Sequence, residues 1–84
     1  MIYGIYAIKD AKTTFMPVNV DINDASAIRN FEHAVRQPDS LLRSHPADYS
    51  FWRVGQFDSV NGEICPVWPP VQLADACNVL KEDV

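Results

Sequence analysis

The sequence has little positive charge, few cysteines and no long apolar run. Seven Lys and Arg residues stand against eleven Asp and Glu residues, which gives a net charge of −4 at pH 7. That balance argues against a histone-like or arm-type nucleic-acid binder, because such proteins draw their affinity from many phosphate contacts. The excess of acidic residues is unevenly distributed. Residues 1–56 hold six basic and six acidic side chains, whereas residues 57–84 hold one basic and five acidic side chains. A neutral, arginine-containing surface remains available on the first two thirds of the chain.

The two cysteines, Cys65 and Cys77, are too few for a disulfide scaffold and too widely spaced for a Cys-x-x-Cys device. We interpret them as small buried hydrophobic residues. With His33 and His45 they make four nominal zinc ligands, but neither the spacing nor the placement is typical of a zinc site. We expect no metal site and no other cofactor.

Catalytic patterns are missing as well. His45 and Asp48 lie close in sequence to Ser44 and Ser50, but a hydrolytic triad needs a scaffold and an oxyanion hole, which neighbours on one loop do not supply. There is no Walker loop, no dinucleotide fingerprint and no pair of catalytic carboxylates. We expect no enzymatic activity and no catalytic residue.

Length and hydropathy predict one small domain, residues 1–84. No apolar run approaches the roughly 18 residues of a membrane helix, and the N-terminus lacks the basic segment and cleavage site of a secretory signal. We therefore expect a cytoplasmic protein without membrane contact. A chain this short buries only about 60 to 65% of its unfolded surface, which favours a homo-oligomer.

The N-terminal residues predict a β-hairpin. Residues 1–9 place apolar side chains on both faces, which suits a central strand covered on two sides. Residues 13–18 predict a second strand, in which Pro17 marks an edge or a strand end because it cannot donate to a ladder.

A helix is expected from residue 24 to residue 37. Asn23 or Asp24 can cap it and Pro38 stops it. Its apolar stripe at offsets of three, four and seven consists of Ala27, Ile28, Phe31, Ala34 and Val35. The connection from 37 to 48 is long for so small a domain, so we expect a helical turn inside it or a binding role.

The second half of the chain repeats this order. Strands at 49–57 and 63–68 flank an Asn-Gly turn, and Pro69-Pro70 is expected to break the sheet. A last helical stripe consists of Leu73, Ala76, Cys77, Leu80 and Val84. The order ββαββα predicts an α+β fold, a four-stranded and mainly antiparallel sheet with two helices packed on one face.

Aromatic residues concentrate in the two predicted central strands. Alternation places Trp52 on one side of its strand and Phe51, Arg53 and Phe57 on the other. Rings exposed beside Arg53 on a helix-free face would stack on unpaired bases, each worth about 1–3 kcal/mol. Core packing or a homodimer interface is the more common use of such a face.

The first helix offers a second candidate surface. Arg29, His33 and Arg36 share a side of it and would suit phosphates, although Glu32 is placed to form ion pairs with both arginines. The candidate nucleic-acid-binding residues are Trp52, Phe51, Arg53, Tyr49, Tyr6, Arg29, Arg36 and Lys12.

The stretch from 45 to 63 also carries a family pattern, His-Pro-Ala-Asp-Tyr-Ser-Phe-Trp-Arg-Val-Gly-Gln-Phe-Asp-Ser-Val-Asn-Gly-Glu. It resembles the small non-structural protein of gokushoviruses, single-stranded DNA phages of the microvirus group, with Trp52 where Tyr is common and Asn61 where Thr is common. Residues 6–17 and 27–31 resemble that family too, so the likeness covers most of the chain.

This resemblance implies a phage non-structural protein that binds DNA. It would act in the host bacterial cytoplasm, during replication of a single-stranded genome or at the switch to packaging, with single-stranded DNA and phage replication or assembly proteins as partners. The acidic last third favours the alternative, a dimeric, non-catalytic adaptor that binds the replication initiator, the procapsid or a host protein without contacting DNA.

Overall fold

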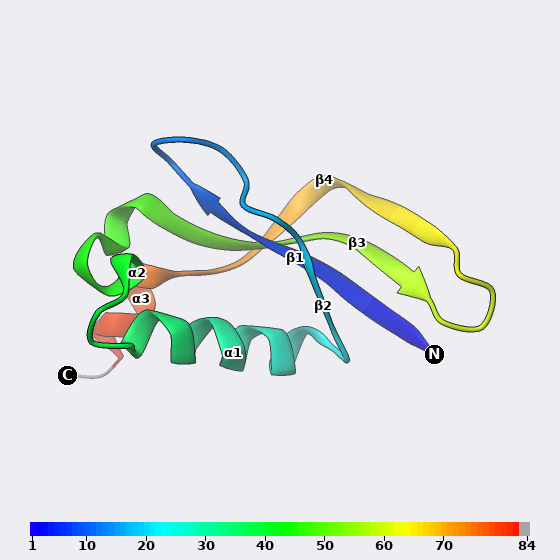
Figure 1. The fold of residues 1–84 in the computed structure, drawn as a ribbon, viewed down its shortest axis with the longest axis horizontal. Helices are drawn as coiled ribbons and strands as arrows, with labels where there is room; N and C mark the ends of the chain where they lie inside the picture. The colour runs from blue at the N-terminus through cyan, green and yellow to red at the C-terminus, as the bar shows by residue number, and fades with distance from the viewer. Residues whose placement is uncertain (83–84) are drawn as a thin grey trace.

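Four antiparallel strands form one sheet in the order β2-β1-β3-β4 in the computed structural model, which describes residues 1–82 (Figure 1). The strands are β1 (Ile2–Asp10), β2 (Asn19–Asp21), β3 (Tyr49–Asp58) and β4 (Ile64–Asp75). β1 and β3 are central, which confirms the prediction made from the two-sided apolar pattern of residues 1–9.

The helices lie on one face of this sheet, below it in Figure 1. They are α1 (Asp24–Arg36), the single turn α2 (Leu41–Ser44), the 3-10 turn η1 (Pro46–Asp48) and α3 (Ala76–Lys81). The predicted α+β fold is confirmed, and the helical turn expected between residues 37 and 48 is present as α2 and η1.

Local sequence explains the bounds of α1. The Asn23 side chain accepts a hydrogen bond from the Ser26 backbone N–H at 2.8 Å and so caps the first turn. The helix ends at Arg36, and Gln37 is extended with φ −64° and ψ 129°, because the ring of Pro38 disfavours the helical conformation at the residue before it.

The core lies between α1, α3 and the helix-facing side of the sheet. Phe51 of β3 stacks on Tyr6 of β1, with ring centroids 5.6 Å apart, and on Phe31 of α1, with centroids 4.9 Å apart. The other buried members of this core are Ala27, Val35, Tyr49, Ala76 and Val79. Three stacked rings thus hold α1 against the two central strands.

The predicted second strand at 13–18 is wrong in position. β2 begins at Asn19, and within residues 11–18 only Phe15 makes an isolated bridge, to Lys9. Regular pairing resumes only after Pro17, which has no N–H to donate to a ladder.

The expected break of the sheet at Pro69-Pro70 is also wrong. β4 continues to Asp75, and its pairing with β3 shifts so that residues 67–70 bulge opposite Val54. β4 is an edge strand, so a residue without an N–H is tolerated there, and the bulge removes the prolines from the ladder.

The stripe predicted for the last helix is partly wrong for the same reason. Because β4 runs past the prolines, Leu73 belongs to a strand and α3 begins only at Ala76. The residue buried in its second half is Val79, whereas Cys77 is half-buried. Val84 lies outside the described residues.

Candidate functional site

The sheet face opposite the helices, here called the open face, is shaped by a bulge at Val54. The register between β1 and β3 shifts there by one residue, which reverses the alternation of β3 side chains. Trp52 pairs with Ala7 and Phe57 pairs with Tyr3, two β1 residues that are four positions apart and so point to the same side. Trp52 and Phe57 therefore share one face of the sheet.

That face is the open one. Phe51 is packed against Phe31 of α1, so its neighbour Trp52 points away from the helices. The prediction that Phe51 and Trp52 lie on opposite sides is confirmed. The prediction that Phe57 shares the side of Phe51 is wrong, because strict alternation does not survive an inserted residue.

Trp52 is the centre of an aromatic and basic cluster with Phe15 and Lys9. Its ring meets the ring of Phe15 edge-on, with centroids 6.0 Å apart and planes at 78°. The Lys9 Nζ lies 5.4 Å from the Phe15 centroid and 5.6 Å from the Trp52 centroid, within range of cation–π attraction to both. The Trp52 Nε1–H donates to Ser50 Oγ at 2.7 Å, which fixes the orientation of the indole.

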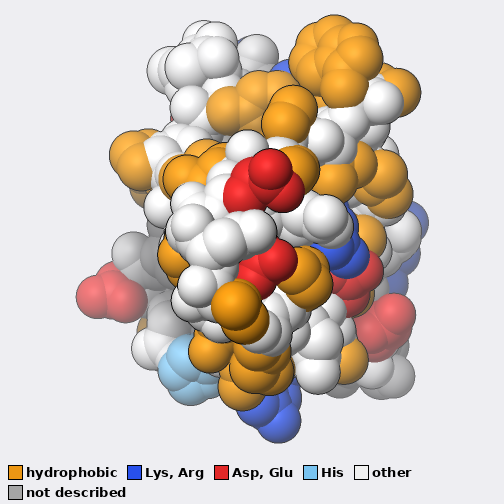
Figure 2. Space-filling view, turned by 90° about the vertical axis from the view of Figure 1, so that its right-hand side faces the viewer, with side chains coloured by type: hydrophobic (Ala, Val, Ile, Leu, Met, Phe, Trp, Pro, Cys, Tyr) orange, Lys and Arg blue, Asp and Glu red, His pale blue; other side chains and the backbone are white. Residues whose placement is uncertain are grey.

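Further apolar side chains extend this face toward the β3–β4 hairpin. Tyr3 and Phe57 lie side by side with ring centroids 6.5 Å apart, and Ile64 of β4 pairs with Phe57. Along β4, Ile64 pairs with Phe57 and Pro66 pairs with Gly55, so these two lie on the open face, while Trp68 lies in the bulge of β4. Trp68 is 84% exposed. The end view in Figure 2 shows hydrophobic side chains on its upper part, which corresponds to the open side of the sheet, and others further down.

Acidic groups flank the open face rather than crossing it. Among the residues of β1 and β3 that pair on this side, all of which the structure describes, Lys9 is the one charged side chain. Asp58 and Glu63 lie at the hairpin turn, where Asp58 accepts from the Val60 N–H at 2.9 Å. Asp75 caps α3 at the opposite end of β4. Three acidic residues of the last third, Asp58, Glu63 and Asp75, therefore lie near the two ends of β4.

Three of the candidate residues cannot stack on a base in this structure. Tyr6, Tyr49 and Phe51 are 0, 8 and 4% exposed, and their rings belong to the core beneath the helices. Their inclusion as candidate stacking residues is corrected, because a base can stack only on a ring face that is accessible from solvent.

Arg53 also points to the helix side, away from Trp52, so the expected pairing of exposed rings with Arg53 is wrong. Its Nη1 donates to Asp24 Oδ1 at 3.1 Å, and the Tyr6 hydroxyl donates to the same oxygen at 2.7 Å. This network ties the first turn of α1 to both central strands. Arg53 therefore stabilises the fold and is not part of an exposed aromatic surface.

The remaining candidates are divided between two surfaces. Arg29 and Arg36 lie on α1, across the sheet from Trp52. Lys12 is exposed in the turn after β1, three residues beyond Lys9. Trp52 lies on the open side, and Figure 1 shows the loop after β1, which contains Lys12, on the side of the sheet opposite α1 and its arginines.

Sequence reasoning missed Lys9, Phe15 and Trp68 as members of this surface. Lys9 lies six residues after Tyr3 in β1, so the two-residue period of a strand places both side chains on the same face. Phe15 reaches Trp52 only through the path of the 11–18 loop, which no spacing rule predicts. The sequence pattern predicts Trp68 as the end of a strand, whereas it lies in the bulge of β4 with its side chain mostly exposed.

Burial raises the pKa of the Tyr6 hydroxyl above its ordinary value of 10.0, and the hydrogen bond to the Asp24 carboxylate raises it further. Burial and the nearby Asp10 carboxylate raise the pKa of Tyr49 in the same direction. Both phenols therefore favour the protonated form in the folded protein.

We expect stability to fall as pH rises above about 10. The unfolded chain loses its tyrosine protons near pH 10 while the folded protein keeps them, so the stabilising contribution is complete below that pH and is lost above it. Thermal midpoints measured by circular dichroism between about pH 8 and about pH 11.5 would show this decline. Tyr6→Phe should have a lower midpoint at pH 8 but a shallower decline, and an equally steep decline in the variant would contradict the role of Tyr6.

Within residues 1–82, no group of three or more His, Cys, Asp or Glu side chains is arranged to hold a metal ion. No helix in the same described part is long and apolar enough to cross a membrane. Cys65 and Cys77 are free and half-buried.

A family model described as "Phage ORF5 protein" matches residues 3–79, a span from β1 into α3 that includes every residue of the open face named above. No curated protein and no solved structure matches the chain.

Proposed function

Because the chain belongs to the phage ORF5 protein family, we propose that it is a phage non-structural protein that binds single-stranded DNA on its open face. It acts in the host cytoplasm without catalysis, during replication of the phage genome or at the switch from replication to packaging. The likeness of residues 45–63 to the gokushovirus pattern supports a single-stranded DNA genome as the setting.

The observation that supports this function best is the Trp52, Phe15 and Lys9 cluster on a sheet face without carboxylates between its rings. Aromatic side chains on a sheet stack on unpaired bases, each contact being worth about 1–3 kcal/mol, and neighbouring cations attract the phosphates. Tyr3 and Phe57 extend the row of rings along the central strands, and Trp68 adds an exposed ring at its edge.

Charge distinguishes single-stranded from double-stranded DNA as the ligand. Duplex binding without base readout depends on neutralising several phosphates, whereas the candidate site within residues 1–82 contains two cations, Lys9 and Lys12. Rings stack only on bases that are free of a partner strand. We therefore expect a preference for unpaired strands and a weak dependence on salt.

Titration of a labelled thymidine oligonucleotide and of a duplex of equal length, each at low and high salt, tests the proposal. We expect the single strand to bind at least about tenfold more tightly, with a log–log salt slope of roughly −1 to −2, as two phosphate contacts predict. Absence of single-strand binding at low salt, by protein shown to be folded, would overturn it.

A second candidate is a dimeric adaptor that binds another phage protein or a host protein and does not contact DNA. Trp68 and the neighbouring exposed Ile64 favour it, because exposed apolar residues beside an acidic hairpin also suit a protein interface. Light scattering distinguishes the adaptor from the DNA-binding protein. A dimer that persists unchanged on addition of DNA, with no bound oligonucleotide, would support the adaptor, and a species of about 9.5 kDa that binds the oligonucleotide would exclude self-association as its basis.

A further inference from the structure

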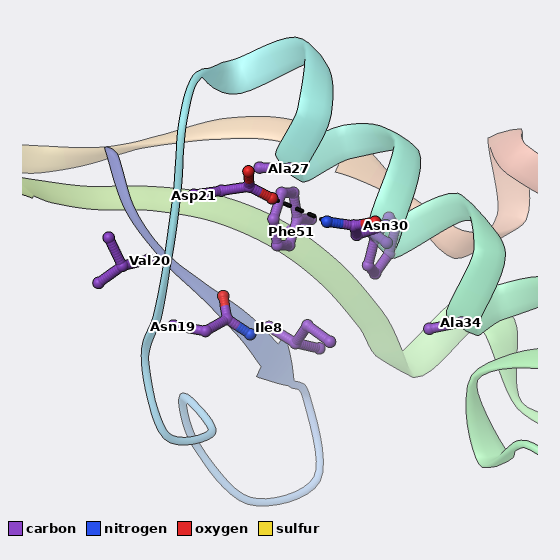
Figure 3. A pocket seen from close by; sticks show the side chains of 9 residues that line it. Ile8, Asn19, Val20, Asp21, Ala27, Asn30, Ala34 and Phe51 are labelled. Carbon is purple, nitrogen blue, oxygen red and sulfur yellow. Dashed lines mark hydrogen bonds between the residues drawn. The ribbon is translucent and has the colours of Figure 1, made fainter. Parts of the chain in front are cut away.

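A cavity of about 260 Å³ lies between β2 and α1, on the helix side of the sheet and away from the open face (Figure 3). Its walls are apolar and come from β1, β3 and α1. The lining residues used below are Phe31, Phe51, Ala34, Asn19, Asp21 and Asn30. Figure 3 shows Asn19 and Asp21 pointing into the space from β2, while Val20 between them points away, as strand alternation requires.

The polar groups at the mouth are rich in acceptors. Asp21 Oδ1 accepts from the Ile22 N–H at 2.7 Å and Oδ2 accepts from Asn30 Nδ2 at 2.8 Å, and the Ser26 side chain also hydrogen-bonds to this carboxylate. The two oxygens offer about four lone-pair sites, so one acceptor position remains. Because Asn30 donates to Asp21, its own carbonyl oxygen stays available. Within the described residues, no hydrogen bond is seen for the side-chain amide of Asn19. Three acceptor groups thus surround an apolar cavity.

Asp21 is ionised at neutral pH. The Ile22 N–H, then the Ser26 and Asn30 side chains, lower the pKa of its carboxyl group, and the nearby charge of Arg29 contributes in the same direction. The Arg29 charge thus lies near the carboxylate, while the hydrogen bonds to it come from Ile22, Ser26 and Asn30.

We propose that this cavity binds an arginine side chain of a partner protein. A guanidinium presents five donors in one plane, which matches several acceptors around a rim better than the single point charge of lysine does. Its aliphatic stem suits the apolar part of the lining. The Asp21 carboxylate complements a basic side chain and would repel a phosphate. The site is separate from the open face, so a partner and DNA can be held together.

The test is a nuclear magnetic resonance titration of ¹⁵N-labelled protein with N-acetyl-arginine N-methylamide, against the citrulline analogue, which has the same shape but no charge. We expect saturable shifts of the Asn19 and Asn30 side-chain amides and of the Ala27 backbone amide, at concentrations on the order of millimolar for so small a probe. Citrulline should bind at least about tenfold more weakly, because it lacks the charge-assisted hydrogen bonds.

Two variants and one control make the test specific. Asp21→Asn should weaken arginine binding about tenfold or more, since it keeps the shape but loses the charge. Ala34→Leu should abolish binding by filling the cavity from α1, where Leu is a good helix former. Asp39→Asn removes one negative charge from an exposed position beyond α1 and should leave binding unchanged.

Equal shifts with arginine and citrulline, or an equal loss in Asp39→Asn, would overturn the proposal, as would no saturation in the folded wild-type protein. Saturation of the cavity by cytidine or adenosine in place of arginine would also overturn it. If Asp21→Asn fails to fold, Ala34→Leu still decides the outcome. None of these results depends on the oligonucleotide titration, so this inference and the proposed DNA binding fail separately.

Discussion

Trp52→Leu is expected to weaken single-stranded DNA binding by about tenfold to a hundredfold, because it removes a stacking contact worth about 1–3 kcal/mol. Trp52 is half-buried on the open face and outside the main core, so the free energy of unfolding should change by only about 1 kcal/mol. Lys9 and Phe15 remain in the variant. The loss of DNA affinity in this variant therefore measures the contribution of the Trp52 indole and not that of the Lys9 charge. The oligonucleotide titration, with urea denaturation alongside it, measures both quantities.

Phe51→Leu is the matched control, one residue away on the opposite face. Its ring packs on Tyr6 and Phe31, so the substitution should cost about 2 kcal/mol of stability and leave DNA affinity of the folded protein unchanged. Trp68→Leu should cost almost no stability, and its effect on binding shows whether the DNA reaches β4. Full DNA affinity in Trp52→Leu, or a larger loss in folded Phe51→Leu, would contradict the open face as the DNA site.

Strand alternation predicted the faces of Phe51 and Trp52 correctly and that of Phe57 incorrectly. The first two precede the bulge at Val54, and local periodicity holds there. A bulge depends on the partner strand, so the sequence of β3 alone does not predict its position. Gly55 was a partial signal, as a residue that permits a bulge or a close approach. A Cβ at Gly55 would lie 2.9 Å from the Cys65 carbonyl oxygen of β4, too close for any other residue without a backbone shift.

Exposure of the candidate rings was harder to predict than the elements that carry them. The sequence predicts aromatic central strands, but which alternate set the helices cover is decided by how α1 docks. Phe31 and Val35 bring α1 onto Tyr6 and Phe51, and that choice leaves Trp52 outside the core. The cluster with Phe15 depends further on the path of an exposed loop. Tertiary packing, rather than any local pattern, therefore selects the surface residues.

The second large effect is expected from Val79→Asp, which should leave the protein largely unfolded at 25 °C. Val79 is 3% exposed and packs in the core shared by α1 and β3, so an ionised carboxylate there has neither water nor a partner. The cost is several kcal/mol, comparable with the whole stability of a domain this small.

Neighbouring substitutions give this prediction its control. The apolar stripe read from the sequence centred on Leu80, whereas the structure turns Val79 fully inward and leaves Leu80 half-buried. Because α3 starts at Ala76 and not at Leu73, the helix is too short for a long periodic pattern to fix its rotation. The loss of unfolding free energy should be largest in Val79→Asp, smaller in Leu80→Asp and smallest in Lys81→Asp. Lys81 is exposed, and a negative charge at this helix C-terminus costs about 1 kcal/mol. Urea denaturation that found the larger loss in Leu80→Asp would show that α3 docks through a different side.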